Sequence, residues 1–320
     1  MQFETVTAGL QFPEGPVALA DGSVLVVEIR RQTLTKISPT GETTIVAHLG
    51  GGPNGAAIGP DGRVYICNNG GFSWIDLGHG VMAPHGKADD YVSGAIQVVD
   101  LATGAIETLY VECDGRPLSS PNDIVFDSQG GFWFTDLGKD HETGHDYGAV
   151  YYATTDGGFI SRQRDKVSWP NGCGLSPDEK VLYVSETWTG RLWAFDVSEP
   201  GVLASPENPF MQGRLVVTLP GYQPFDSLGV LANGDVCVAT CINGGKSHIK
   251  PTIISGFSSR RFFRQRHDDV LSGLCPAPDF DRHFLLHNHV VAKNVRHLQF
   301  CHRHGRHEQH TGCQQDSNLH

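Results

Sequence analysis

The sequence predicts an all-β fold, a six-bladed β-propeller, on three observations. The first is the composition, because 39 glycines and 18 prolines in 320 residues favour many short strands joined by tight turns. The second is the absence of any segment of 12 or more residues with a clear helical period of 3.6. The third is a repeat that returns at the spacing of a propeller blade.

Each copy of the repeat begins with a polar residue, here called the anchor, and reaches the end of a turn eight residues later. The five anchors are Glu14, Asn54, Asn122, Asn171 and Asp226. A stretch rich in β-branched and aromatic residues follows every turn, for example at 24–28 and 132–136. This order is typical of a β-hairpin. The anchors lie 40 to 68 residues apart, which suits a four-stranded blade with loops of variable length.

The end of the chain differs from the rest. A faint sixth copy lies at 272–279, and 284–286 matches the strand that follows. Residues 1–245 carry a charge balance of −16, whereas 246–320 carry +5 and 11 of the 16 histidines. We therefore predict a propeller over 1–289 with a degenerate or poorly ordered last blade, and a tail without ordered structure over 290–320. A metal- or anion-binding tail and a divergent or frame-shifted end both stay open.

Several function classes are disfavoured by the composition. A net charge of −11 argues against a nucleic-acid surface. The sequence contains no run of 18 apolar residues, so it predicts no membrane-spanning helix. The first residues do not resemble a secretory signal, so we expect a cytoplasmic protein. The eight cysteines form no CxxC motif, which predicts reduced thiols. The sequence leaves the oligomeric state open.

The anchors predict a common site, because the same template position in every blade points toward the propeller axis. All five anchors offer side-chain oxygen, the donor that Ca²⁺ takes from carboxylates and amides. No histidine or cysteine is an anchor, so zinc is less favoured. Asn and Asp before Gly are also ordinary turn residues. We favour a metal site because every anchor is polar and the two acids belong to the first and fifth copies.

Four separated motifs resemble one known family. They are Pro13–Pro16, Ser120–Asp123, Trp169–Gly172 and Asp226–Leu228 with 233–240, and the stretch 131–136 also fits. Over about residues 10–245, the chain resembles the gluconolactonase, senescence-marker-protein (regucalcin) and luciferin-regenerating-enzyme family.

The resemblance implies a set of site residues. By it, Glu14, Asn171 and Asp226 hold a divalent metal, and Asn122 contacts the metal or the substrate. Asn54 lies on the same ring and is a further candidate for substrate binding. The family often places an arginine before the second motif, and Arg116, six residues before Asn122, is the matching candidate for binding sugar hydroxyls.

The predicted function is the metal-dependent hydrolysis of a small sugar-type lactone. Ca²⁺ is the expected cofactor, with Zn²⁺, Mg²⁺ and Mn²⁺ as alternatives, and it polarises the lactone carbonyl. Asp226 is the predicted catalytic base. A phosphotriesterase-type or other metal-dependent ester hydrolase, or a non-catalytic calcium-binding propeller, is the alternative. The chain has no G-x-S-x-G motif, and His141 and His145 are expected to be solvated loop residues rather than zinc ligands.

Overall fold

The computed structural model describes residues 4–78, 80–241, 245–249 and 297–300. All regular secondary structure in these residues is β-strand, as the sequence predicts. No described helix is long and apolar enough to cross a membrane. The five cysteines in the described part, Cys67, Cys113, Cys173, Cys237 and Cys241, are free thiols, which agrees with the expected reduced state.

Five antiparallel sheets correspond to the five repeats, and we number them blades I to V. Blade I contains β2 (Pro13–Ala18), β3 (Val24–Glu28), β4 (Thr33–Ile37) and β5 (Thr43–His48). Blade II contains β6 (Pro53–Ile58), β7 (Val64–Asn68), β10 (Ala95–Val99) and β11 (Ile106–Tyr110). Blade III contains β14 (Pro121–Phe126), β15 (Gly131–Asp136), β18 (Gly148–Thr154) and β19 (Ile160–Val167).

The last two blades depart from this pattern of four strands: blade IV has one strand more, and blade V has one fewer among the described residues. Blade IV contains β20 (Pro170–Leu175), β21 (Val181–Glu186), β22 (Arg191–Glu199) and β24 (Arg214–Thr218), and the short β23 (Val202–Leu203) also pairs with β22. Blade V has three described strands, β25 (Phe225–Val230), β26 (Val236–Thr240) and β27 (Gly245–Ile249).

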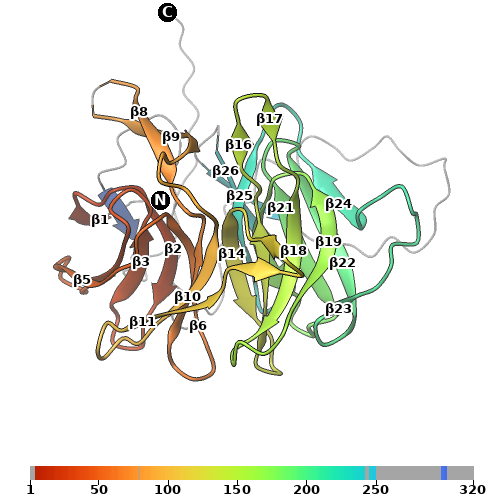
Figure 1. Ribbon diagram of the computed structural model, residues 1–320, viewed down its shortest axis with the longest axis horizontal. Coiled ribbons are helices and arrows are strands. Elements are labelled where there is room, and N and C mark those ends of the chain that lie inside the picture. Colours follow the sequence, from red (N-terminus) through yellow and green to blue (C-terminus); the bar gives the residue numbers. More distant parts are fainter. Residues whose placement is uncertain (1–3, 79, 242–244, 250–296, 301–320) are drawn as a thin grey trace, which may run out of the picture.

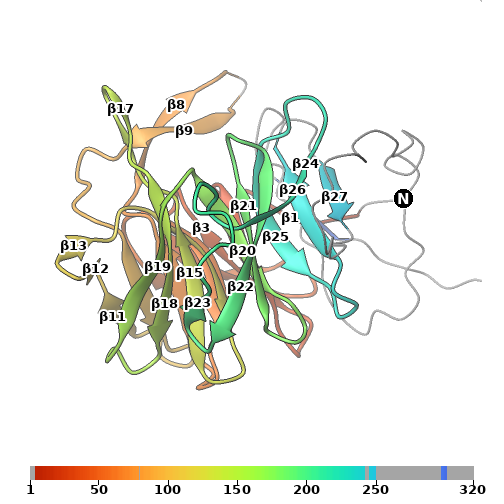
Figure 2. The same ribbon diagram turned by 90° about the vertical axis from the view of Figure 1, so that its right-hand side faces the viewer.

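Three additional hairpins extend from blades II and III or join them. They are β8–β9 (Phe72–Asp76 and Met82–Lys87), β12–β13 (Glu112–Cys113 and Arg116–Pro117) and β16–β17 (Asp140–His141 and Gly144–His145). Hairpins β8–β9 and β16–β17 rise from the same end of the molecule (Figures 1 and 2). That end also carries the anchors, since each hairpin follows the strand that pairs with the beginning of an anchor strand.

The turn that ends each copy of the repeat has the conformation its sequence predicts. Four copies end in glycine, and each of these glycines has a positive φ: Gly22, Gly62, Gly130 and Gly234. The fourth copy has Glu179 at this place, and it adopts φ 57° despite its side chain. A left-handed residue here closes the tight hairpin between the first two strands. The repeat therefore correctly predicts the hairpin between the first two strands of all five blades.

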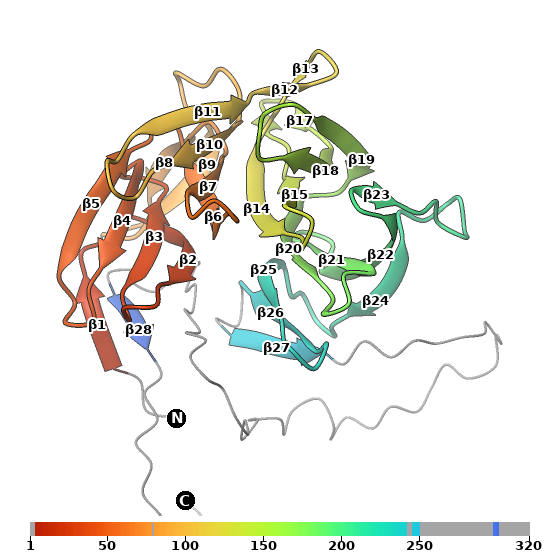
Figure 3. The ribbon, with the colours of Figure 1, turned by 90° about the horizontal axis from the view of Figure 1, so that it is seen from below.

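The blades fan out around a central axis, and the anchor strands β2, β6, β14, β20 and β25 lie innermost (Figure 3). The hydrophobic core lies between neighbouring blades. Leu25 and Val27 of blade I pack with Val64 and Ile66 of blade II. Large aromatic side chains fill the next two interfaces, with Phe132 between blades II and III and Trp193 between blades III and IV. Burial of each of these aromatic side chains stabilises the interface between two blades by a few kcal/mol.

The first strand lies on the open side of blade I. Strand β1 (Glu4–Ala8) pairs with β28 (His297–Phe300), and the two lie beside blade I (Figure 3). Val6 of β1 packs against Val24, Val26 and Ile37, on the face of blade I away from blade II. Four residues of the predicted unordered tail, 297–300, thus form a strand. The faint sixth copy at 272–286 and the rest of the tail lie outside the described residues, so a sixth blade stays a prediction.

Candidate active site at the propeller axis

Every anchor lies at an irregularity in its strand. In all five inner strands the pairing register shifts directly at or after the anchor, for example between Pro170 and Cys173 and between Phe225 and Leu228. Such β-bulges change the direction in which side chains point and are common next to active sites. Because of the bulges, the side chains of Asn171 and Asp226 need not follow the regular alternation between the two faces of a strand.

The backbone freed by the bulges is held by hydroxyl groups of the second strands. Thr135 of β15 accepts a hydrogen bond from the Asp123 N–H (3.1 Å) and donates one to the carbonyl oxygen of Asn171 in the next blade (2.5 Å). Ser185 of β21 does the same, with the Gly172 N–H (2.9 Å) and the carbonyl oxygen of Asp226 (2.6 Å). The backbones of the anchors Asn171 and Asp226 are thus each tied to the blade before them.

A second set of buried polar residues holds the loops that lead into the anchors. Each ends a second strand: Glu28, Asn68, Asp136 and Glu186. Their side-chain oxygens accept hydrogen bonds from backbone N–H groups just before the anchors, as Asp136 does from Ser119 and Ser120 (both 2.7 Å). The sequence interpretation missed these residues. Their signal is a polar residue that closes the strand after every turn.

Asp226 lies among groups that act on its protonation. Burial raises the pKa of its carboxyl group, while hydrogen bonds from the Asn171 side chain, the Ser227 N–H and the Cys241 thiol lower it. The Cys241 Sγ is 3.8 Å from Oδ2 of Asp226. Burial raises the pKa of this thiol, and the Asp226 and Glu14 carboxylates both add to the rise. The two acidic anchors, from blades I and V, therefore lie near the same thiol.

Asn171 offers an unused acceptor beside this carboxylate. Its side chain is 8% exposed, and Nδ2 donates a hydrogen bond to Oγ1 of Thr187 (3.1 Å). Its buried Oδ1 has no hydrogen-bond partner among the described residues. A buried carbonyl oxygen without a partner is costly unless a ligand completes it.

The donor set suits a hard cation. In the described part of the chain, no three His, Cys, Asp or Glu side chains gather into a metal site of those groups alone. A site at the axis therefore needs the amide oxygen of Asn171 beside the carboxylates of Glu14 and Asp226. Carboxylate and amide oxygens are the ligands of Ca²⁺, so these residues fit the cofactor that the resemblance implies.

Asp123 is a candidate that the sequence interpretation missed. It follows the anchor of blade III, where blades I, II and IV have glycine. Those glycines lie against the next inner strand, since a Cβ on Gly172 would be 2.4 Å from the Leu228 nitrogen. The Asp123 carboxylate instead accepts hydrogen bonds from its neighbour Ile124 (2.9 Å) and from Cys173 of blade IV (3.2 Å).

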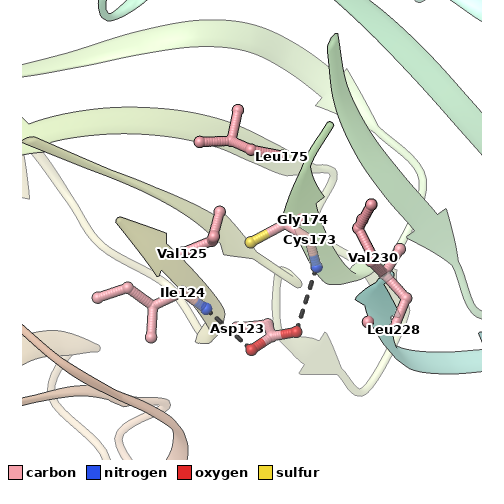
Figure 4. Close-up of a pocket in the computed structure, with 9 residues that line it drawn as sticks. Asp123, Ile124, Val125, Cys173, Gly174, Leu175, Leu228 and Val230 are labelled. Carbon is pink, nitrogen blue, oxygen red and sulfur yellow. Dashed lines mark hydrogen bonds between the residues drawn. The ribbon is translucent and has the colours of Figure 1, made fainter. Parts of the chain in front are cut away.

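A cavity of about 250 Å³ lies beside Asp123, between the inner strands of blades III, IV and V (Figure 4). Apart from Asp123, the residues that line it have apolar side chains or none, with Leu175, Leu228 and Val230 among them. Burial raises the pKa of Asp123 to about 7, although its hydrogen bonds from the Ile124 and Cys173 N–H groups lower it. The charge of Asp226 adds to the rise. Asp123 can therefore gain or lose a proton near neutral pH.

The other predicted residues differ in position. Asn122 is buried on β14, and its backbone carbonyl lies against Gly55 of blade II. Asn54 is half-buried on β6, where its carbonyl lies against Gly15 of blade I. Both are therefore on the ring of inner strands. The structure does not bring Arg116 there: hairpin β12–β13 turns it outward, where it is exposed and 3.6 Å from Asp165 of β19.

Hairpin β16–β17 holds two histidine–aspartate pairs, His141 with Asp146 (2.8 Å) and His145 with Asp140 (2.9 Å). His141 is 43% exposed, as expected for a loop histidine. His145 is not solvated in this way, because its ring stacks on Trp169 with centroids 3.6 Å apart.

Lys139 connects blade III to hairpin β8–β9. It is 1% exposed, donates a hydrogen bond to the carbonyl oxygen of Asn69 (2.6 Å) and lies 4.1 Å from the ring centroid of Phe72. Tyr91 supplies a second ring at 4.9 Å. Burial lowers the pKa of Lys139 to about 7 from 10.5, against the charges of Asp136 and Asp140.

This lowered pKa predicts a pH dependence of stability. Between pH 7 and 10.5 the unfolded chain binds the Lys139 proton and the folded chain does not, so rising pH stabilises the fold. Relative to Lys139→Met, the wild-type chain should gain about 4 kcal/mol of unfolding free energy over this range, at about 1.4 kcal/mol per pKa unit with partial titration at both ends. Urea unfolding at pH 7 and pH 10 measures it. A difference between the two proteins that does not change with pH would contradict the assignment.

A model of the SMP-30/gluconolactonase/LRE-like region matches residues 12–252, which include all five anchors. The chain belongs to this family. Among relatives, Lactonase drp35 of Staphylococcus epidermidis strain RP62A is 28% identical over 249 residues, 74% of this chain and 68% of that protein. Lactonase drp35 of Staphylococcus aureus strain MRSA252 is 30% identical over 217 residues, 64% of this chain and 60% of that protein.

Several solved structures share the fold. A gluconolactonase from Xanthomonas campestris aligns with a TM-score of 0.58 at 22% identity, over 77% of this chain and 75% of that one. A calcium-binding protein, regucalcin, from Agrobacterium tumefaciens has the same TM-score at 17% identity, over 77% and 74%. A streptogramin B lyase also aligns, with a TM-score of 0.53 at 15% identity, over 78% and 69%. The fold alone therefore does not determine the reaction.

Proposed function

We propose that the protein is a metal-dependent lactone hydrolase. Its site is the axial ring, by which we mean the anchors Glu14, Asn54, Asn122, Asn171 and Asp226 around the propeller axis. The observation that carries the proposal is the buried Oδ1 of Asn171, which has no partner among the described residues and lies beside the Asp226 carboxylate. Membership of the family, and relatives named as lactonases, support a lactone as the substrate. A neighbour named as a calcium-binding protein supports Ca²⁺ over Zn²⁺, Mg²⁺ or Mn²⁺.

Glu14, Asn171 and Asp226 would hold the cation, with Asn122 and Asn54 turned toward the substrate. When bound, the cation supplies Lewis-acid polarisation of the lactone carbonyl. Asp226 accepts a proton from the attacking water. Burial raises the pKa of its carboxyl group, which strengthens it as a base, and the Asn171, Ser227 and Cys241 hydrogen bonds act in the opposite direction and favour the ionised form.

Ring opening also needs a proton at the leaving alkoxide. Asp123 is the group we assign to this proton, because its pKa of about 7 and its position near Asp226 let it hold a proton at neutral pH. Water thus loses one proton to a carboxylate, and the former ring oxygen gains one. Arg116 has no part in this proposal, since the structure places it on the outside of blade III.

A panel of three substrates separates the proposal from its alternatives. Rates are measured with δ-gluconolactone, an aryl ester and a phosphotriester, each in Ca²⁺, after chelation and after Ca²⁺ is restored, with spontaneous ring opening subtracted. We expect the lactone to react fastest, chelation to stop the reaction and Ca²⁺ to restore it. A preference for the triester would instead support a phosphotriesterase, and calcium binding without turnover would support a non-catalytic propeller. The cytoplasmic location stays a prediction.

A further inference from the structure

Aromatic side chains form a row beside the axial ring. The His145 ring stacks on Trp169, Trp169 meets Trp188 edge-on with centroids 5.5 Å apart, and Trp188 lies nearly parallel to Tyr222 at 6.4 Å. These residues come from blade III, from the two loops at the anchor end of blade IV, and from the loop before β25 of blade V. The row therefore crosses three blades on the face that carries the anchors.

The row is joined to the anchors by hydrogen bonds. Thr187, the neighbour of Trp188, accepts the hydrogen bond from the Asn171 side chain (3.1 Å) and donates its own N–H to the Trp169 carbonyl oxygen (3.0 Å). Its carbonyl oxygen accepts the Phe225 N–H, next to Asp226. Trp188 is therefore the direct sequence neighbour of a residue that is hydrogen-bonded to the anchor Asn171 and to the residue before Asp226.

Trp169 holds an unusual backbone conformation for this position, with φ 52°. A left-handed conformation is costly for a bulky residue and collects at functional sites. In blade I the matching residue, Phe12, also has a positive φ of 58°, but its partner Trp74 is half-buried and lies under the Arg30 guanidinium. On the side of blades IV and V, by contrast, Trp188 is 51% and Tyr222 57% exposed.

We propose that Trp188 and Tyr222 form a second subsite that stacks on a neutral sugar ring attached to the lactone. The preferred substrates are then glycosyl-extended aldonolactones rather than bare ones. A pyranose presents C–H groups on one face and keeps its hydroxyls in water, which suits aromatic faces that are half-exposed. The excess of acidic residues over 1–245 disfavours an anionic substituent. This inference rests on the proposed function for its catalytic step.

Two lactones measure the subsite directly: δ-gluconolactone and its 4-O-glucosyl derivative, cellobionolactone. The wild-type chain should show about a tenfold higher kcat/KM for the extended lactone, the size of one good stacking contact. Trp188→Ala and Tyr222→Ala should each bring this ratio toward one. Phe159→Ala is the matched control, since Phe159 is 52% exposed in the turn between β18 and β19 at the opposite end of blade III, and it should keep the ratio.

The outcomes separate the two proposals. A wild-type ratio near one, or a ratio that survives in both aromatic variants, overturns the subsite while leaving lactone hydrolysis intact. If neither lactone is hydrolysed, the proposed function fails, and the subsite is tested by tryptophan fluorescence during titration with cellobiitol against glucitol as the control. Cellobiitol should then bind the wild-type chain and bind Tyr222→Ala about tenfold more weakly. Absence of that binding overturns the subsite as well.

Discussion

Replacement of Asp226 by asparagine is expected to lower kcat for lactone hydrolysis by about 10²- to 10⁴-fold, the usual contribution of a general base. Asparagine keeps an oxygen that can bind Ca²⁺ but cannot accept a proton from water, so turnover should fall much further than metal affinity. Steady-state kinetics in saturating Ca²⁺, with calorimetry on the same sample, measures both.

The control for Asp226→Asn is Asp196→Asn, which removes a carboxylate that is 65% exposed on β22 and should keep full activity. If Asp226→Asn retains near wild-type kcat, Asp226 is not the base. Asp123, a carboxylate of the axis with a raised pKa, would then be the next candidate to test.

Glu14→Gln should affect the metal before the chemistry. Loss of one full charge beside a divalent cation is expected to weaken Ca²⁺ binding on the order of 10³-fold, since unit charges at 4 Å interact by about 4 kcal/mol near a protein surface and about 1.4 kcal/mol is a factor of ten. Activity should return in excess Ca²⁺, because glutamine still offers an oxygen.

Activity measured across a Ca²⁺ series tests this, with Glu42→Gln, an exposed residue of blade I, as the control. A Glu14→Gln protein that binds Ca²⁺ normally but stays inactive at every concentration would show that Glu14 takes part in the chemical step instead.

The repeat predicts the fold well because its information is local. A polar anchor, a turn eight residues later and a β-branched strand specify one hairpin, and the structure repeats that hairpin in each of the five blades. Even the left-handed turn residue recurs, at Glu179 as at Gly22. The sequence cannot show how the blades meet, since those contacts join residues far apart in the chain. The β-bulges and the inter-blade bonds of Thr135 and Ser185 therefore appear only in three dimensions.

The site was predicted only in part for the same reason. The shared position of Glu14, Asn171 and Asp226 on the inner strands could be predicted because they occupy one template position, and their role in binding a metal stays a prediction. Asp123 was missed because it occupies the next position, which glycine fills in three blades and where the template gives a side chain no function. Arg116 was expected near the ring because the family often places an arginine before the second motif, but Arg116 lies in hairpin β12–β13, which turns it outward to Asp165. His145 gains its burial from Trp169, 24 residues later in the sequence.

The most direct test of the axial metal site is a Ca²⁺ titration of chelator-stripped protein, with δ-gluconolactone turnover followed at every addition. The proposal predicts no enzymatic turnover in the stripped protein and activity that rises in proportion to bound Ca²⁺. It also predicts that the rise ends at one equivalent per chain, and that Asn171→Ala shifts the curve to higher Ca²⁺. Full activity in the stripped protein, or a curve that Asn171→Ala leaves unchanged, would contradict a metal held by Glu14, Asn171 and Asp226.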